Sequence, residues 1–304
     1  NQIKAQVSPF AIREGEIKTF DGKDGYVSMN QIVHKINIGH ITDIHFAILE
    51  LVNQFEFITS RQLYQMLEIK GIDAKSQDKL NNKLEALVKS KILTRYYFTS
   101  EEGKGIYRIY CLEKMGKYLL NSKEIECKWQ PSDNTKPVPM IKKRLAGNQT
   151  LIAYLRKVKA FDDFVVKPSL TAKTAGKVFK ATGGSVKLTK NKKSIQFLFE
   201  VIRREPDWKK KLVEKMRLYQ DFYANFVPGD SGFSTMPQLI FVCEDEKHMA
   251  ETFKEIITNQ VEIPQLKLYF TTDLRQNEET LENTLVEFKL VDGKYKMENI
   301  ELKL

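Results

Sequence analysis

Apolar residues recur at helical spacing from residue 42 onward and predict three successive helices. Thr42 is a suitable N-cap for the first of them, whose apolar face covers residues 44–52. Thr59 and Gln62 have the spacing of a capping box, in which the two residues satisfy each other's backbone N–H groups, so a second helix is expected to begin there. Ser76 is expected to cap a third helix that carries a stripe of leucines.

The pattern then changes from helical spacing to strand-like spacing. Residues 93–98 are rich in aromatic residues and predict a strand, residues 101–103 form a polar turn, and residues 106–110 predict a second strand. A last helix is expected over residues 113–121. Three helices followed by a hairpin are typical of a winged helix-turn-helix, which we therefore expect over residues 42–121.

A winged helix suits double-stranded DNA for a geometric reason. One helix fits the major groove, while the hairpin, or wing, reaches the adjacent backbone. Amide side chains on the third helix could pair with adenine edges, and lysines could meet phosphates. The candidate DNA-binding residues are Lys75, Gln77, Lys79, Asn82, Lys83 and Lys89 around that helix, with Arg95, Tyr97, Lys104 and Arg108 on or beside the wing. The alternative is an adaptor that uses the winged helix to contact protein, and Glu101 and Glu102 near the wing tip count slightly toward it.

The rest of the chain divides into an arm, a linker and a second domain. Residues 1–41 hold two Asp-Gly pairs and are expected to form an arm or hairpin, and the Pro-rich residues 122–139 are expected to be a linker. Over residues 140–304 apolar strands alternate with amphipathic helices, which predicts an α/β domain. Its strands are expected at 194–202, 238–243 and 266–271, its helices at 140–158, 207–226 and 247–258, with a hairpin turning at Asp292-Gly293.

Two stretches of this second domain resemble the replication-relaxation family of mobile-element proteins. Residues 197–205 read Phe-Leu-Phe-Glu-Val-Ile-Arg-Arg-Glu and precede a helix with Lys215 and Tyr219 one turn apart; residues 141–148 resemble the family's entry into its second domain. The resemblance covers about residues 42–270. It implies a winged helix joined to a domain like the PD-(D/E)XK nucleases, with a central mixed sheet. It also implies a plasmid, phage or integrative element and a role in controlling replication, conjugative transfer or transcription.

Cleavage by such a nuclease requires two carboxylates that hold a divalent metal and a lysine that orients water. Glu200 matches the second carboxylate, but residues 182–185 read Thr-Gly-Gly-Ser where the companion Asp is expected. Ile202 occupies the place of the lysine. We therefore expect an inactive, nuclease-like domain, and a metal-dependent endonuclease remains the alternative function. Glu200 is expected to pair with a cation inside the fold, for which the candidates are Arg203, Lys187 and Lys215.

The net charge of +10 favours a polyanionic partner, because binding to phosphates releases counterions. Lysines in the second domain suggest a second DNA contact, although a lysine run can equally be a solvated turn. These lysines are Lys190, Lys192, Lys193, Lys209, Lys210 and Lys211.

The spacing of residues in the sequence does not indicate a metal, cofactor or membrane site. Cys111, Cys127 and Cys243 are too far apart for a zinc or disulfide framework and are expected to be small buried or bystander thiols, and the four histidines have no ligand spacing. We expect no cofactor or metal, no membrane partner and a cytoplasmic location. Besides double-stranded DNA, a second copy of the chain and replication or transfer proteins are candidate partners.

Overall fold

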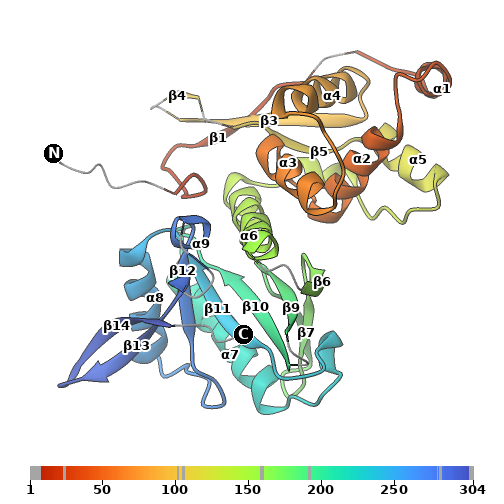
Figure 1. The fold of residues 1–304 in the computed structure, drawn as a ribbon. Helices are drawn as coiled ribbons and strands as arrows, with labels where there is room; N and C mark the ends of the chain where they lie inside the picture. The colour runs from red at the N-terminus through yellow and green to blue at the C-terminus, as the bar shows by residue number, and fades with distance from the viewer. Residues whose placement is uncertain are drawn as a thin grey trace. The chain divides into compact units, whose positions relative to one another are not determined.

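The computed structural model describes residues 8–22, 25–100, 103–104, 107–157, 161–190, 193–278, 280 and 283–300. The described chain is a mixed α and β protein, as expected. Its contacts divide it into an N-terminal unit, Arg13–Leu145, and a C-terminal unit, which combines Asn1–Ile12 with Ala146–Leu304. The division falls inside helix α6 (Val138–Lys157). The elements of both units are labelled in Figure 1.

Three capped helices open the main part of the N-terminal unit. They are α2 (Asp43–Phe55), α3 (Ser60–Ile69) and α4 (Gln77–Lys89). The expected caps are confirmed: Thr42 and Thr59 are N-caps with capping boxes, and the Ser76 hydroxyl accepts the Lys79 N–H at 3.2 Å. The leucine stripe of α4 is buried, so packing and capping agree on where this helix begins and which face it covers.

A sheet follows α4, with strands in the order β1-β3-β5-β2 and β4 paired with β3. The bounds are β1 (Ile17–Phe20), β2 (Ile58–Thr59), β3 (Leu93–Ser100), β4 (Gly103–Lys104) and β5 (Ile109–Leu112). The strand expected from residue 93 is confirmed. The second expected strand is described over Ile109–Leu112, where its ladder with β3 runs from Leu93↔Leu112 to Tyr96↔Ile109, and its expected first residue, 106, lies outside the described residues. Helix α5 (Lys114–Ser122) comes next.

The segment before residue 42 contributes strand β1 to this sheet. Within the described residues β1 pairs with β3, and the ring of Phe20 meets Tyr96 edge-on at 5.9 Å. Helix α1 (Met29–Asn37), capped by Ser28, follows in place of a second strand. Of the two expected forms, an arm or a hairpin, the described residues 8–22 and 25–41 show no strand pair of their own, because β1 pairs with β3 instead.

The Pro-rich segment after α5 packs onto the N-terminal unit. It contains the short helix η1 (Pro131–Thr135). The Trp129 indole donates to Asn134 Oδ1 at 3.2 Å, and the Asn134 amide donates to the Leu112 carbonyl at 3.1 Å. The Lys117 ammonium donates to the Trp129 carbonyl at 2.8 Å. These bonds tie residues 129–134 to β5 and α5.

Among the described residues of the C-terminal unit, seven strands form one mixed sheet in the order β14-β13-β12-β11-β10-β9-β6. Strands β10, β11 and β12 are parallel and the other pairs are antiparallel. The bounds are β6 (Phe161–Val165), β9 (Gly184–Lys190), β10 (Lys193–Val201), β11 (Gln238–Cys243), β12 (Tyr269–Thr272), β13 (Leu285–Val291) and β14 (Lys294–Ile300). The hairpin at Asp292-Gly293 is confirmed.

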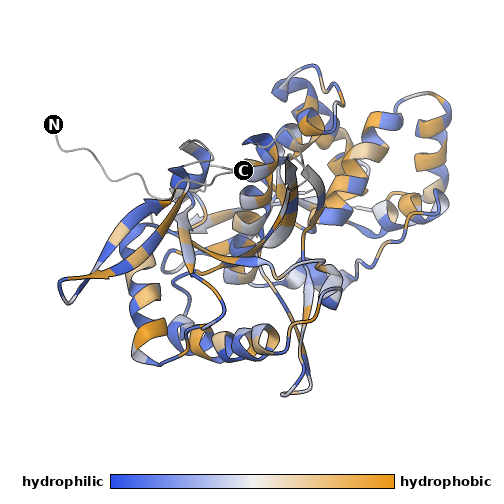
Figure 2. Ribbon diagram, turned by 60° about the horizontal axis from the view of Figure 1, so that its bottom comes forward, coloured by the Kyte–Doolittle hydropathy of each residue, from blue (hydrophilic) through white to orange (hydrophobic). Residues whose placement is uncertain are grey.

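Helices cover both faces of this sheet. Phe197 and Phe199 of β10 contact Tyr154 of α6, with ring centroids 6.1 and 4.7 Å away. Leu198, between them, points to the opposite face and joins a core with α7 (Trp208–Ala224) and α8 (Glu246–Thr258). Figure 2 shows polar and apolar residues alternating along these helices. Because side chains alternate along β10, Glu200 lies on the same face of the strand as Leu198 and points toward α7.

A separate hairpin packs against α7. It consists of β7 (Ser169–Ala172) and β8 (Lys177–Lys180), which pair antiparallel. Leu170 is buried in the core with α7, and the ring of Phe179 meets Tyr219 edge-on at 5.1 Å. The N–H groups of Thr174 and Ala175 in the turn donate to the Asp221 carboxylate at 3.1 and 2.7 Å. The hairpin is thereby fixed along one side of α7. Short elements α9 (Arg275–Glu278) and η2 (Asp230–Gly232) complete the unit.

Candidate nucleic-acid interface

The outer face of α4 carries polar side chains that the fold does not use. Lys79 and Asn82 are exposed and Lys83 is half-buried, while Leu80 and Leu84 between them are fully buried. Within the described part of the chain, the side chains of Lys79, Asn82 and Lys83 form no ion pair or hydrogen bond, and the bond to the Ser76 hydroxyl is made by the Lys79 backbone N–H. These three candidate residues therefore lie on one accessible surface, with both amide and ammonium groups available.

The other candidate residues of α4 and its entry have partners. Lys75 lies in the left-handed region (φ 68°) and pairs with Asp73 at 2.6 Å, and Lys89 pairs with Glu85 at 3.5 Å. The Gln77 amide donates to the Ser60 carbonyl at 3.3 Å and to Asn81 Oδ1 at 3.2 Å. The two lysine pairs are exposed, where an ion pair contributes little stability and can be exchanged for another anion.

The two candidate arginines of β3 and of the residue before β5 pair with acids from elsewhere in the N-terminal unit. Arg95 pairs with Glu85 of α4 at 2.5 Å and with Asp21 at 3.1 Å. Burial acts to lower the pKa of Arg95, but these acids outweigh it and raise the pKa. Arg108 also pairs with Asp21, at 2.5 Å, and its guanidinium lies 4.7 Å from the centre of the Tyr97 ring. The side chain of Lys104 lies outside the described residues.

Glu200, at the end of β10, is the centre of a buried hydrogen-bonded cluster. Its Oε1 accepts from the Lys215 ammonium at 2.7 Å and from the Thr182 hydroxyl at 2.9 Å. Its Oε2 accepts from the Tyr219 hydroxyl at 2.8 Å and from the Thr182 N–H at 3.2 Å. Burial, and secondarily the Glu200 charge, raises the pKa of Tyr219. The expected pairing of Glu200 with Lys215 is confirmed, whereas Arg203 has a different partner.

The two glycines of residues 182–185 have no space for a side chain, so neither position can carry the companion carboxylate. A Cβ atom on Gly183 would lie 2.6 Å from Phe199 Cβ, and one on Gly184 would lie 2.8 Å from the Val165 carbonyl. Gly147 of α6 packs as closely, since a Cβ there would lie 2.5 Å from the Thr182 carbonyl. Across the described residues, no group of three histidines, cysteines or acids could hold a metal ion.

A second cluster lies where the parallel strands end. The Arg203 guanidinium donates to both oxygens of Asp273, at 2.7 and 2.9 Å, and the Ser8 hydroxyl donates to the same carboxylate. Burial raises the pKa of Asp273, against the opposing effect of Arg203. Arg204 is also bonded to acids: its guanidinium pairs with Asp245 at 2.6 Å, and its backbone N–H donates to the Glu244 carboxylate at 3.0 Å. These carboxylates are committed to arginines.

The sequence analysis did not single out Asp273 or Glu244, although a signal was present. Each acid directly follows an apolar strand, Phe-Val-Cys before Glu244 and Phe-Thr-Thr before Asp273. Carboxyl ends of neighbouring parallel strands meet at one edge of a sheet, so such acids are expected to lie near one another.

The lysines expected to form a second DNA contact differ in whether the structure describes them and in whether they form ion pairs. Lys192 lies outside the described residues, as do the side chains of Lys190 and Lys193. Lys209 pairs with Glu255 at 2.8 Å and Lys211 pairs with Glu205 at 3.2 Å, both at the surface. Lys210 is exposed without an ion pair among the described residues.

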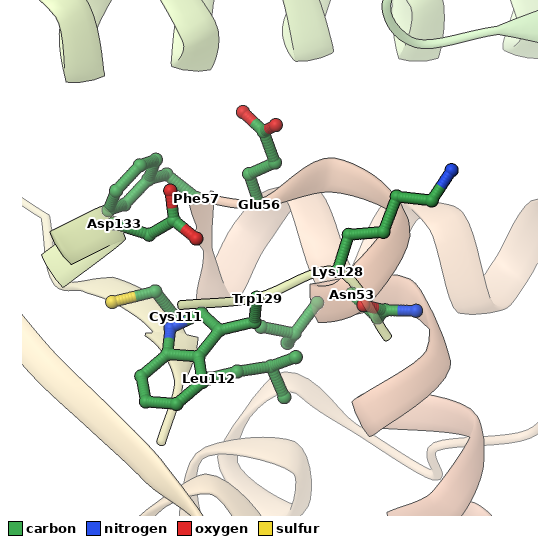
Figure 3. A pocket seen from close by; sticks show the side chains of 9 residues that line it. Asn53, Glu56, Phe57, Cys111, Leu112, Lys128, Trp129 and Asp133 are labelled. Atoms are coloured by element: carbon green, nitrogen blue, oxygen red, sulfur yellow. The ribbon is translucent and has the colours of Figure 1, made fainter. Parts of the chain in front are cut away.

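A small cavity lies in the N-terminal unit between α2, β5 and the Pro-rich segment. Its volume is about 150 Å³, and Figure 3 shows Trp129, Cys111 and Asp133 among the side chains around it. Pockets for small ligands usually measure about 300–1,000 Å³, so this cavity is too small for that role. Burial raises the pKa of Cys111, and all three cysteines are buried free thiols, as expected.

Comparisons with protein-family models and with curated proteins give no match for this chain. No helix in the described part of the chain has both the length and the apolar character that are needed to cross a membrane.

Proposed function

We propose that this chain binds double-stranded DNA sequence-specifically, with residues 42–121 as a winged helix-turn-helix and α4 as its recognition helix. The observation that supports it most is the outer face of α4, where Lys79, Asn82 and Lys83 have no partner within the described chain. The order α2, α3, α4, β3, β5 is the one that a winged helix requires.

The chemistry of this face matches the major groove. An asparagine amide can donate to N7 and accept from N6 in the pattern that adenine presents, while lysines on either side can meet phosphates. A helix of 13 residues spans about 20 Å, which is enough to cross the groove. The net charge of +10 favours the approach to DNA.

The C-terminal unit is proposed to be a nuclease-like domain that does not cut DNA. Glu200 is held by Lys215, Tyr219 and Thr182, and the two glycines of residues 182–185 have no space for a side chain. By its resemblance to the replication-relaxation family, the protein would serve a plasmid, phage or integrative element in controlling replication, transfer or transcription. A homodimer on a repeated or palindromic site suits that role.

One observation favours a second candidate function, contact with a protein through the same fold. Asp21 and Glu85 compensate the wing residues Arg95 and Arg108, so the wing offers less free positive charge than its sequence suggests. An adaptor would use the wing in this neutralised form. Its complexes would be formed without DNA and would not weaken steeply with salt.

The test replaces the three unpaired side chains on the outer face of α4. The triple variant Lys79→Ala, Asn82→Ala, Lys83→Ala should lose its preference for a selected duplex over random DNA, by about 100-fold, since each base contact is worth about 1–3 kcal/mol. Fluorescence anisotropy with labelled duplexes measures both affinities. Lys247→Ala with Lys254→Ala, exposed lysines of α8, is the matched control and should change little. An unchanged preference in the triple variant would remove α4 as the recognition helix.

A further inference from the structure

A basic groove runs between β8 and α7 in the C-terminal unit. Its volume is about 680 Å³, and it is open to solvent rather than enclosed. Five cations line it, against one acid, Glu214: Lys177 and Lys180 from β8, and Lys211, Lys215 and Arg217 from α7. Lys215 belongs to the Glu200 cluster, but that cluster does not account for the other four cations of the groove.

Three of these cations have no counter-charge. Within the described residues Lys177, Lys180 and Arg217 form no ion pair, and all three are exposed. Lys211 pairs with Glu205 at 3.2 Å but remains half exposed. Cations without counter-charges repel one another, so an anionic ligand stabilises the groove by supplying the missing negative charge.

The fold holds the walls of the groove in place. Asp221 of α7 accepts two N–H groups from the β7–β8 turn, and Phe179 packs on Tyr219 at the base. Glu200 holds the Lys215 ammonium from below at 2.7 Å, which keeps this lysine oriented instead of freely rotating. Cations positioned before binding lose less entropy when a ligand arrives.

The length of groove that the cations border indicates a polymeric ligand. Lys211 and Lys215 lie one turn apart on one side of α7, and Arg217 lies about 9 Å along the helix axis from Lys211 on another side, so the cations border about 9 Å of the groove rather than form one line. One DNA strand advances by about 3.4 Å per nucleotide, so this length spans two to three phosphates. An open groove lets a chain of phosphates enter and leave, which a closed chamber would prevent.

We propose that this groove binds the phosphodiester backbone of a nucleic acid strand, as a contact independent of α4. Lys177, Lys180 and Arg217 supply the uncompensated charges, and the Lys215 ammonium, held by Glu200, supplies hydrogen-bond donors at the base. Backbone contact of this kind is insensitive to sequence and depends strongly on salt.

The test uses the full chain in the Lys79→Ala, Asn82→Ala, Lys83→Ala background, so that α4 does not contribute. The groove variant is Lys177→Glu, Lys180→Glu, Arg217→Glu, and the matched control is Lys247→Glu, Lys254→Glu, Lys294→Glu, exposed lysines away from the groove with the same change in charge. Anisotropy with a 30-nucleotide oligothymidylate and a random 30-base-pair duplex is measured between 50 and 200 mM NaCl. The milder variant Lys177→Ala, Lys180→Ala, Arg217→Ala is measured if circular dichroism shows that the glutamate variant is unfolded.

We expect the groove variant to lose at least tenfold in affinity at 50 mM salt for one or both probes. Its salt slope should fall by about 2–3, close to 0.7–0.9 for each lost phosphate contact. The control should lose less than threefold. Equal losses in the two variants would overturn the proposal. So would a groove variant that keeps nucleic-acid affinity but loses binding to polyglutamate or to inorganic phosphate, because the ligand would then be an acidic protein or a free anion. Failure of the α4 variants leaves this result unaffected, and the reverse also holds.

Discussion

Single side chains decide what the C-terminal unit can do, and Glu200 is the clearest case. A carboxylate at the end of an apolar strand can hold a metal, but its partners here are an ammonium and two hydroxyls. The side chain of Glu200 is 3% exposed and that of Lys215 is 22% exposed. Because Glu200 is the deeper partner, it depends on Lys215 more than Lys215 depends on it.

This asymmetry predicts unequal costs of substitution. Lys215→Met should lower the free energy of unfolding by about 2–4 kcal/mol, because it leaves a buried carboxylate with neutral donors only. Glu200→Gln should cost about 1–2 kcal/mol, because the lysine can still reach solvent. The double variant should cost less than the sum. Urea unfolding measures all three, and Lys210→Met, an exposed lysine of the same helix, should stay within about 0.5 kcal/mol. Equal single costs that simply add would contradict the coupling.

His248 predicts a pH dependence. Burial, followed by the charges of Arg204 and Arg203, lowers its pKa to about 3, against an opposing effect of Asp245. Its Nδ1 accepts the Glu244 N–H at 3.3 Å, so it is neutral in the folded chain. The unfolded chain binds a proton below about pH 6.5, so His248 favours unfolding as the pH falls from 6.5 toward 3 and has no such effect above 6.5.

The measurement compares the unfolding free energy of the native chain and of His248→Asn, which keeps an acceptor near the Glu244 N–H, between pH 7.5 and 4.5. The native chain should lose up to about 1.4 kcal/mol per pH unit more than the variant below pH 6. Parallel curves for the two proteins would show that His248 is not held neutral by the fold.

At the scale of elements, the charge of the proposed wing depends on three segments rather than on a hairpin alone. Asp21, which directly follows β1, pairs with Arg95 of β3 and with Arg108 just before β5, and Glu85 of α4 pairs with Arg95. Asp21 is therefore the acid that compensates both arginines of the proposed wing.

Removing that acid should strengthen DNA binding. Asp21→Asn keeps the size of the side chain but frees charge on Arg95 and Arg108, so affinity for random duplex should rise by about two- to fivefold with a steeper salt dependence. Asp292→Asn, at the exposed turn of the β13–β14 hairpin, changes the net charge equally and is the control. Anisotropy at 100 mM NaCl measures both variants. A rise that is the same in both would mean that only net charge matters and that the wing does not contact the backbone.

The elements that the sequence predicted best are those determined by near neighbours. The caps at Thr59 and Ser76 bond to residues three positions away, and the Asp292-Gly293 turn joins adjacent strands, so local pattern is sufficient. The site residues are different. Arg95 meets Asp21 across 74 residues and Ser8 meets Asp273 across 265, and no spacing in the sequence indicates those partners. Local pattern located candidate cations, but only the fold separates the free Lys79 from the compensated Arg95.

At the scale of the whole molecule, the proposed DNA contacts lie in both units. The N-terminal unit offers α4, with an amide able to discriminate bases, and the C-terminal unit offers the basic groove, with cations that read no sequence. The chain passes between the units twice, within helix α6 and between Ile12 and Arg13, where it has no regular secondary structure. A protein with one specific and one non-specific contact would find its site by electrostatic attraction and hold it by base contacts.

Selection of bound duplexes from random-sequence DNA by the full chain tests the central claim most directly. After several rounds at 150 mM NaCl, the account predicts one enriched motif that binds at least about 1,000-fold more tightly than random duplex. The Lys79→Ala, Asn82→Ala, Lys83→Ala variant should fail to enrich that motif. No enrichment by the native chain, or the same motif enriched by the variant, would contradict the assignment of α4 as a DNA-reading helix.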